Sequence, residues 1–158
     1  MAASIFKWQG LLKPSTMRTV AERRFDDAEA LRQTEENARA NGVAYLAGVV
    51  IDILLKAKLI EKFPAIAKMG QHELSDDERG VWFLIWKSHD LEDMLSHLSE
   101  VEASVKKIGE RAGYDYHGNL KKLCATWTIQ ARYSSRTLLM TEAAELLDRV
   151  RRLNEVFK

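Results

Sequence analysis

The most apolar part of the sequence, residues 42–59, constrains the fold more than any other feature. Its apolar residues recur mostly three or four positions apart, which is helical spacing, and they surround most of the helix: Val43, Leu46, Val49, Val50, Ile53, Leu54 and Ala57. A helix that is apolar on nearly all sides lies inside a bundle rather than at its edge. We therefore expect the other helices to pack around residues 42–59.

Two polar residues, Asp52 and Lys56, interrupt this helix. They are four positions apart, so they share a face and can pair. A carboxylate inside an apolar core costs free energy unless it is hydrogen-bonded or neutralised. Asp52 therefore requires a partner.

The overall composition describes one ordinary globular domain. The 158 residues include 24 basic and 23 acidic side chains, for a net charge of +1, so nucleic acid or a membrane would be bound only through a local patch. The single cysteine, Cys124, cannot form an internal disulfide and favours a reducing compartment. The N-terminus has no signal-peptide pattern, and the longest apolar run is too short to span a bilayer. We expect a cytoplasmic protein without membrane contact, metal or cofactor.

Periodicity and capping signals divide the chain into helices. Residues 1–16 are predicted to be a loosely held arm, and residues 17–158 a single helical domain. We expect helices over 17–39 and 42–59, joined by a turn at Asn41-Gly42, then a connector over 60–74 and a short helix that begins with the capping box at Ser75.

The second half of the chain shows the same alternation of helical patterns and polar breaks. An apolar stripe over 91–108 follows a cap at Ser88 and predicts either one helix or two with a break near Ser99. A loop is expected over 109–118, and further helices are expected after caps at Asn119 and Thr141. No segment alternates with a period of two, so the prediction is an all-α antiparallel bundle of about five to six helices.

The order of these features resembles the HEPN domain of prokaryotes. A helix containing RRFDDAEAL precedes the apolar helix, His89-Asp90-Leu91 then opens a helix, and Trp127 and Arg132-Tyr133 precede a final amphipathic helix. The resemblance covers roughly residues 17–157. It implies an up-and-down helical bundle, frequently dimeric, that acts on or with nucleotides or RNA. Some HEPN proteins are ribonuclease toxins, and others accompany a minimal nucleotidyltransferase that silences them.

The catalytic pattern of the ribonuclease members is broken in this chain. That pattern is an arginine, four to six further residues and a histidine. Arg132 corresponds to the arginine, but residues 133–139 contain no histidine. The resemblance therefore implies a member without catalytic residues at the usual place.

An arginine and a histidine at the required spacing occur elsewhere, at Arg111 and His117. A metal-independent ribonuclease needs a base for the 2′-hydroxyl proton and a cation for the developing phosphorane charge, and this pair offers both. The alternative interpretation is a surface turn.

His89, Asp93 and His97 are successively four apart, a spacing that can hold a metal on one helix face. We favour a structural His89 that is hydrogen-bonded to another helix.

Our main site hypothesis pairs Asp52 with Arg132, because a guanidinium can donate two parallel hydrogen bonds to the two oxygens of a buried carboxylate. The structural version of the hypothesis is an ion pair that holds the bundle in register. The functional version places Arg132, Tyr133 and Arg136 at the mouth of a groove, where the cations meet phosphate and the ring stacks on a base.

Two further groups have a structural and a functional interpretation. The arginines of the last helix indicate a solvated face or a weak RNA contact: Arg149, Arg151 and Arg152. The aromatic residues Trp82, Phe83 and Trp86 are most simply core, and they mark a protein interface if they are exposed.

Three functions follow from these observations. The favoured one is a non-catalytic HEPN-like module that forms a homodimer or pairs with a protein such as a nucleotidyltransferase, in the manner of a toxin–antitoxin pair, and that binds nucleotide or RNA. The alternatives are a ribonuclease toxin, and a structural protein that only assembles with itself.

Overall fold

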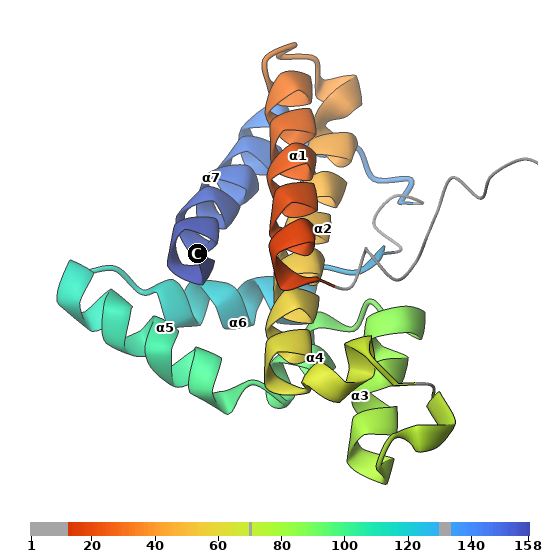
Figure 1. Cartoon of the computed structure of the whole chain (residues 1–158). Coiled ribbons are helices and arrows are strands. Elements are labelled where there is room, and N and C mark those ends of the chain that lie inside the picture. The colour runs from red at the N-terminus through yellow and green to blue at the C-terminus, as the bar shows by residue number, and fades with distance from the viewer. Residues whose placement is uncertain (1–12, 70, 130–133) are drawn as a thin grey trace, which may run out of the picture.

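The computed structural model describes residues 13–69, 71–129 and 134–158. Within these ranges the chain is all-α and contains no strand, as the sequence predicts (Figure 1). Seven α-helices are joined by loops and short 3₁₀ turns: α1 Pro14–Arg32, α2 Ala40–Lys62, α3 Asp76–Lys87, α4 Leu91–Ser96, α5 Ser99–Ala112, α6 Tyr116–Thr126 and α7 Met140–Phe157. The 3₁₀ turns that lie wholly within the described residues are η2 Asn37–Arg39, η3 Pro64–Ala67 and η4 Gln71–Glu73.

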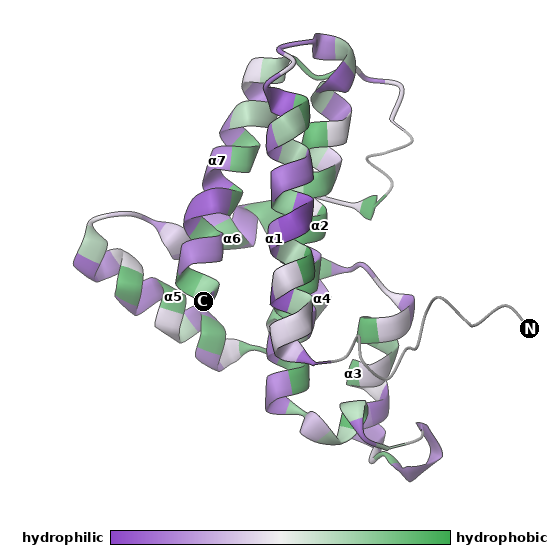
Figure 2. Ribbon diagram, turned by 45° about the horizontal axis from the view of Figure 1, so that its top comes forward, coloured by the Kyte–Doolittle hydropathy of each residue, from purple (hydrophilic) through white to green (hydrophobic). Residues whose placement is uncertain are grey.

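The helix α2 is the centre of the bundle, which confirms the main expectation from the sequence. It has 23 residues, of which more than half are buried, and it contacts α1, α7, α4 and α3. Figure 1 shows α1 lying along α2, and α7 packs against both of these helices. The outer helices are amphipathic (Figure 2); α7, for example, buries one stripe: Met140, Ala143, Leu147, Val150, Leu153 and Phe157.

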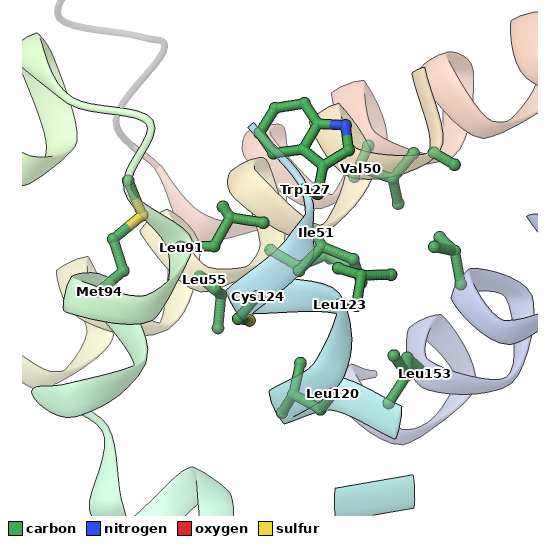
Figure 3. Packing of buried hydrophobic residues seen from close by; sticks show 14 of the residues in the cluster. Val50, Ile51, Leu55, Leu91, Met94, Leu120, Leu123, Cys124, Trp127 and Leu153 are labelled. Carbon is green, nitrogen blue, oxygen red and sulfur yellow. The ribbon is translucent and has the colours of Figure 1, made fainter. Parts of the chain in front are cut away.

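Helices α4 and α6 close the core on the remaining side of α2. Figure 3 shows Leu91 and Met94 of α4 and Leu120, Leu123 and Cys124 of α6 facing Ile51 and Leu55 of α2. The same hydrophobic cluster includes Leu153 of α7, so one continuous core joins all four helices.

The predicted turn at Asn41-Gly42 was wrong, because both residues lie inside α2. The first helix ends earlier, at Arg32, and the chain reverses through Glu35, whose φ of 58° is in the left-handed region. Gly42 instead gives close packing, since a Cβ at this position would lie 3.3 Å from Leu31 Cδ1.

The loop predicted over 109–118 was also wrong. Helix α5 continues to Ala112, and Gly113 ends it with a left-handed φ of 66°. The α6 helix begins only three residues later, because the carboxylate of Asp115 accepts a hydrogen bond from Gly118 N at 2.8 Å.

Three predicted caps are displaced, whereas the capping box at Ser75 is confirmed. Asp90 rather than Ser88 caps α4, Asp115 rather than Asn119 caps α6, and α7 begins before Thr141. The stripe over 91–108 forms two helices, α4 and α5, which are separated at His97 and Leu98.

Helix α1 starts at Pro14, so residues 14–16 of the predicted arm are helical, and residues 1–12 lie outside the described residues. Among the described helices, none has the length and apolarity that crossing a bilayer requires.

Candidate functional site

The carboxylate of Asp52 lies in the core with 4% of the residue exposed. Its Oδ2 accepts a hydrogen bond from Lys56 Nζ at 3.0 Å, which confirms the pairing predicted from their spacing. The same Oδ2 lies 3.2 Å from Nδ1 of His89, so the histidine is bonded across to another helix, as predicted. The Oδ1 atom is buried and has no hydrogen-bond partner in the part of the chain that the structure describes.

His89 reaches Asp52 from the short connection between α3 and α4. Its side chain is 44% exposed, so the imidazole spans from the buried carboxylate to solvent. Because His89 precedes α4, it does not share a helix face with Asp93 and His97, contrary to the spacing argument. No cluster of three possible metal ligands occurs among the described residues.

Two members of the predicted ligand site, Arg132 and Tyr133, lie outside the described residues, so the Asp52–Arg132 pair stays a prediction. Arg136 is described, and its backbone carbonyl accepts a hydrogen bond from Asn41 Nδ2 at 2.8 Å. Asn41 precedes Asp52 by eleven residues along α2, which is a rise of about 16 Å. The structure therefore places the backbone of Arg136 at the start of α2, about three turns from Asp52.

Two asparagines on consecutive turns hold the segment before α7 against the start of α2. Asn41 Oδ1 accepts a hydrogen bond from Leu138 N at 2.9 Å, and Asn37 Oδ1 accepts one from Met140 N at 2.8 Å. Between these two residues, Leu139 N donates a hydrogen bond to Glu142 Oε2 at 2.9 Å. These side chains satisfy the N–H groups of the two residues before α7 and of Met140, its first residue.

An open groove of about 330 Å³ lies where Asn41 contacts the segment before α7. Its lining combines one cation, one amide, three hydroxyl groups and two apolar side chains: Arg136, Asn41, Thr126, Thr128, Ser134, Ala44 and Leu138. The Arg136 side chain is 75% exposed, and its one described ion pair, to Glu142, is long at 3.4 Å. The guanidinium is therefore available to a ligand.

Trp127 fixes the wall of the groove between Thr126 and Thr128. The indole is 7% exposed and lies directly on Gly48 of α2, where a Cβ would be 1.9 Å from two ring atoms. Its ring centroid is 6.3 Å from that of Tyr45. The indole Nε1 is buried and has no hydrogen-bond partner among the described residues. Figure 3 shows the indole beside α2, close to Val50.

The alternative catalytic pair, Arg111 and His117, lies on the opposite arm of the molecule, in the α5–α6 hairpin. Arg111 is exposed in the last turn of α5. His117 Nε2 lies 3.1 Å from Glu102 Oε1, so this nitrogen is engaged with a carboxylate. A separate groove of about 340 Å³ is lined by His117, Tyr114, Tyr116 and Lys106, and Arg111 is not among its lining residues.

The arginines of α7 mostly have protein partners. Arg151 bonds to Glu29 at 2.8 Å, and the Arg152 guanidinium lies 4.7 Å from the ring centroid of Tyr114. The thiol of Cys124 is buried in the core, and burial, assisted by the charges of Glu92 and Glu102, raises its pKa to about 12. It is therefore not a nucleophile at neutral pH.

The comparisons add no family to these observations. Models of known protein families, curated protein sequences and solved structures were each compared with this chain, and none matches it significantly.

The groove residues were largely missed by sequence reasoning. Of its lining only Arg136 was a predicted site residue, and Asn41 was interpreted as part of a turn. A signal did exist for Asn37 and Asn41, because their spacing of four residues puts two amide side chains on one helix face.

Proposed function

We propose that this chain is a non-catalytic helical module of the HEPN type that binds the phosphate of a nucleotide or RNA in the Arg136 groove. The observation that carries the proposal is the combination of an exposed, loosely paired guanidinium with the hydroxyl groups of Thr128 and Ser134 in one groove. The third hydroxyl of the lining, Thr126 Oγ1, already donates to Lys122 O at 2.7 Å. Arginine and hydroxyl side chains are the usual donors to phosphate oxygens. The volume is within the range of small-ligand sites.

The sequence context supports the same class of ligand. Arg132 and Tyr133 precede the groove segment directly, and they correspond to the arginine motif of the HEPN ribonucleases, which lacks its histidine here. Because the chain has a net charge of only +1, binding depends on these local cations and is expected to be weak and salt-sensitive.

Pairing with a second protein is the other part of the proposal. A homodimer, or a complex with a minimal nucleotidyltransferase of the toxin–antitoxin type, rests on the HEPN resemblance alone. Sedimentation at several protein concentrations tests self-association, and co-purification with a nucleotidyltransferase from a neighbouring reading frame tests the hetero-complex.

The binding experiment uses a fluorescent single-stranded RNA oligonucleotide, with ATP as the competitor, at low salt. Arg136→Ala is expected to weaken binding about tenfold, the cost of one charge-assisted hydrogen bond to phosphate. Arg24→Ala is the matched control, because Arg24 is an exposed arginine of α1 that is paired with Asp27 and is not among the residues that line the groove. Equal affinity of the Arg136 variant and the native chain would refute the groove as the binding site.

The same samples test the ribonuclease alternative. Incubation with total RNA is expected to leave it intact. Cleavage that is abolished by His117→Ala would replace the non-catalytic proposal with the hydrolytic one.

A further inference from the structure

The α3 helix presents an apolar face that the folded core does not use. Phe83 is 55% exposed, and Met69, which follows the adjoining η3 turn, is 49% exposed. Trp82 and Trp86, whose ring centroids are 6.3 Å apart, flank Phe83 and pack against the core with only part of their surface. A Cβ at Gly80, one turn before Phe83, would meet nothing within 4 Å, so the face is open along the helix.

We propose that the N-terminal segment, residues 1–12, docks in cis on this α3 face and covers Phe83. The segment has large apolar side chains of its own that need burial: Ile5, Phe6, Trp8, Leu11 and Leu12. A contiguous exposed apolar patch on a single chain indicates an interaction site, and residues 1–12 are the longest stretch of the sequence that lies outside the described residues.

The attachment point of the segment lies at the end of α2 that adjoins η3 and α3. Residue 13 leads directly into α1, and Arg18 in the next turn of α1 forms an ion pair with Glu61 in the last turn of α2. Helix α2 continues into η3, and η3 contacts α3. Figure 1 shows α3 at this end of α2.

Reach and charge are both compatible with docking in cis. Twelve extended residues span about 40 Å, which exceeds the length of α3, about 18 Å. Lys7 lies among the apolar residues of the segment and Lys13 follows them, and the first turn of α3 is acidic, with Asp76, Asp77 and Glu78. Tethering also gives a high effective concentration, which a second molecule would have to match with a much larger interface.

The test uses the full chain with a nitroxide spin label on a thiol introduced by Ser4→Cys, in a Cys124→Ala background. The indole N–H signals of Trp82 and Trp86 are followed by NMR. We expect both signals to lose most of their intensity, and we expect Phe83→Asp to restore it. Leu139→Asp is the matched control, because Leu139 is also 55% exposed but lies before α7, and this change is expected to leave the broadening intact.

Two outcomes would overturn the proposal. Undiminished Trp82 and Trp86 signals in the labelled chain would show that the segment does not approach α3. Equal broadening when spin-labelled chain is mixed with isotope-labelled chain lacking the nitroxide would show docking on a second copy instead. The Trp127 indole signal reports in each sample that the core is folded.

Discussion

Removal of either charge from the buried Asp52–Lys56 pair is expected to destabilise the fold strongly, whereas removal of both is not. Asp52→Asn leaves the ammonium of Lys56, which is 8% exposed, without its carboxylate. Lys56→Met leaves the carboxylate with His89 as its remaining described partner. Breaking a buried pair costs 3–5 kcal/mol in general, and since Lys56 retains some access to water we expect about 3 kcal/mol for each single variant.

The double variant Asp52→Asn/Lys56→Met contains neither buried charge. The asparagine oxygen still accepts a hydrogen bond from His89, and we expect the free energy of unfolding to return to within about 1 kcal/mol of the native value. For a chain of this length, the loss of 3 kcal/mol corresponds to a decrease in Tm of about 6–12 °C. Urea unfolding followed by circular dichroism measures all four proteins.

The sign of the coupling decides whether the pair acts as described. If the two single costs add in the double variant, to about 6 kcal/mol, the side chains do not compensate one another and the assignment fails. Single costs below about 1 kcal/mol would show that Asp52 and Lys56 are not desolvated as a pair.

Three further predictions concern packing, reactivity and acid stability. Gly48→Ala should cost about 1–3 kcal/mol and shift the indole NMR signal of Trp127, because the new methyl group would overlap the ring; an unchanged signal would contradict this packing. Cys124, with a pKa raised to about 12, should react with a thiol reagent only as fast as the chain unfolds, and a rapid reaction of the native protein would contradict its burial. Glu61 and Glu100 both have a pKa below the ordinary 4.5. The stability that they contribute is therefore present above pH 4.5 and is lost as the pH falls through their folded pKa values, so a Glu61→Gln/Glu100→Gln variant should lose less stability in acid titration than the native chain.

The opposing effects at these two carboxyl groups explain the direction of each shift. At Glu61 burial raises the pKa. The hydrogen bond from Arg18 and the charge and hydrogen bond of Lys58 together lower the pKa by more than burial raises it. At Glu100 the hydrogen bond from its own backbone amide lowers the pKa most, and the hydrogen bond and charge of Lys62 add to this against the effect of burial. Replacement of Arg18 by methionine should therefore remove part of the acid sensitivity.

Local patterns predicted the parts of the fold that depend on local interactions. The apolar spacing of residues 42–59 was sufficient to identify the central helix, and the four-residue spacing of Asp52 and Lys56 was sufficient to predict their pairing. The capping box at Ser75 was also readable, because both of its partners lie within three residues.

The groove was not predictable in the same way, because its residues meet only in the folded chain. Asn41 bonds to Arg136 and Leu138, which are more than ninety positions away, and nothing near Asn41 in the sequence indicates this use. Asn-Gly is normally a turn signal, so the sequence predicted a turn at Asn41 and gave no indication of its hydrogen bonds to the segment before α7. Gly48 is a similar case, since the close approach of Trp127 becomes apparent only when α6 is packed on α2.

The loop predicted over 109–118 failed for a different reason. Three glycines and several polar residues favoured an irregular segment, but Gly109 is buried inside α5 and packs against the backbone of Tyr114. The close approach of that backbone, rather than flexibility, accounts for this glycine.

The central claim is that phosphate binds in the groove that Arg136 and its neighbouring hydroxyl groups form. The most direct measurement is an NMR titration of the isotope-labelled chain with ATP, with the backbone amide signals assigned. We expect the largest shifts at Thr126, Thr128, Ser134 and Arg136, and we expect them to disappear in Arg136→Ala. Shifts confined to the His117 groove of the α5–α6 hairpin, or no shifts at any ATP concentration, would contradict this claim.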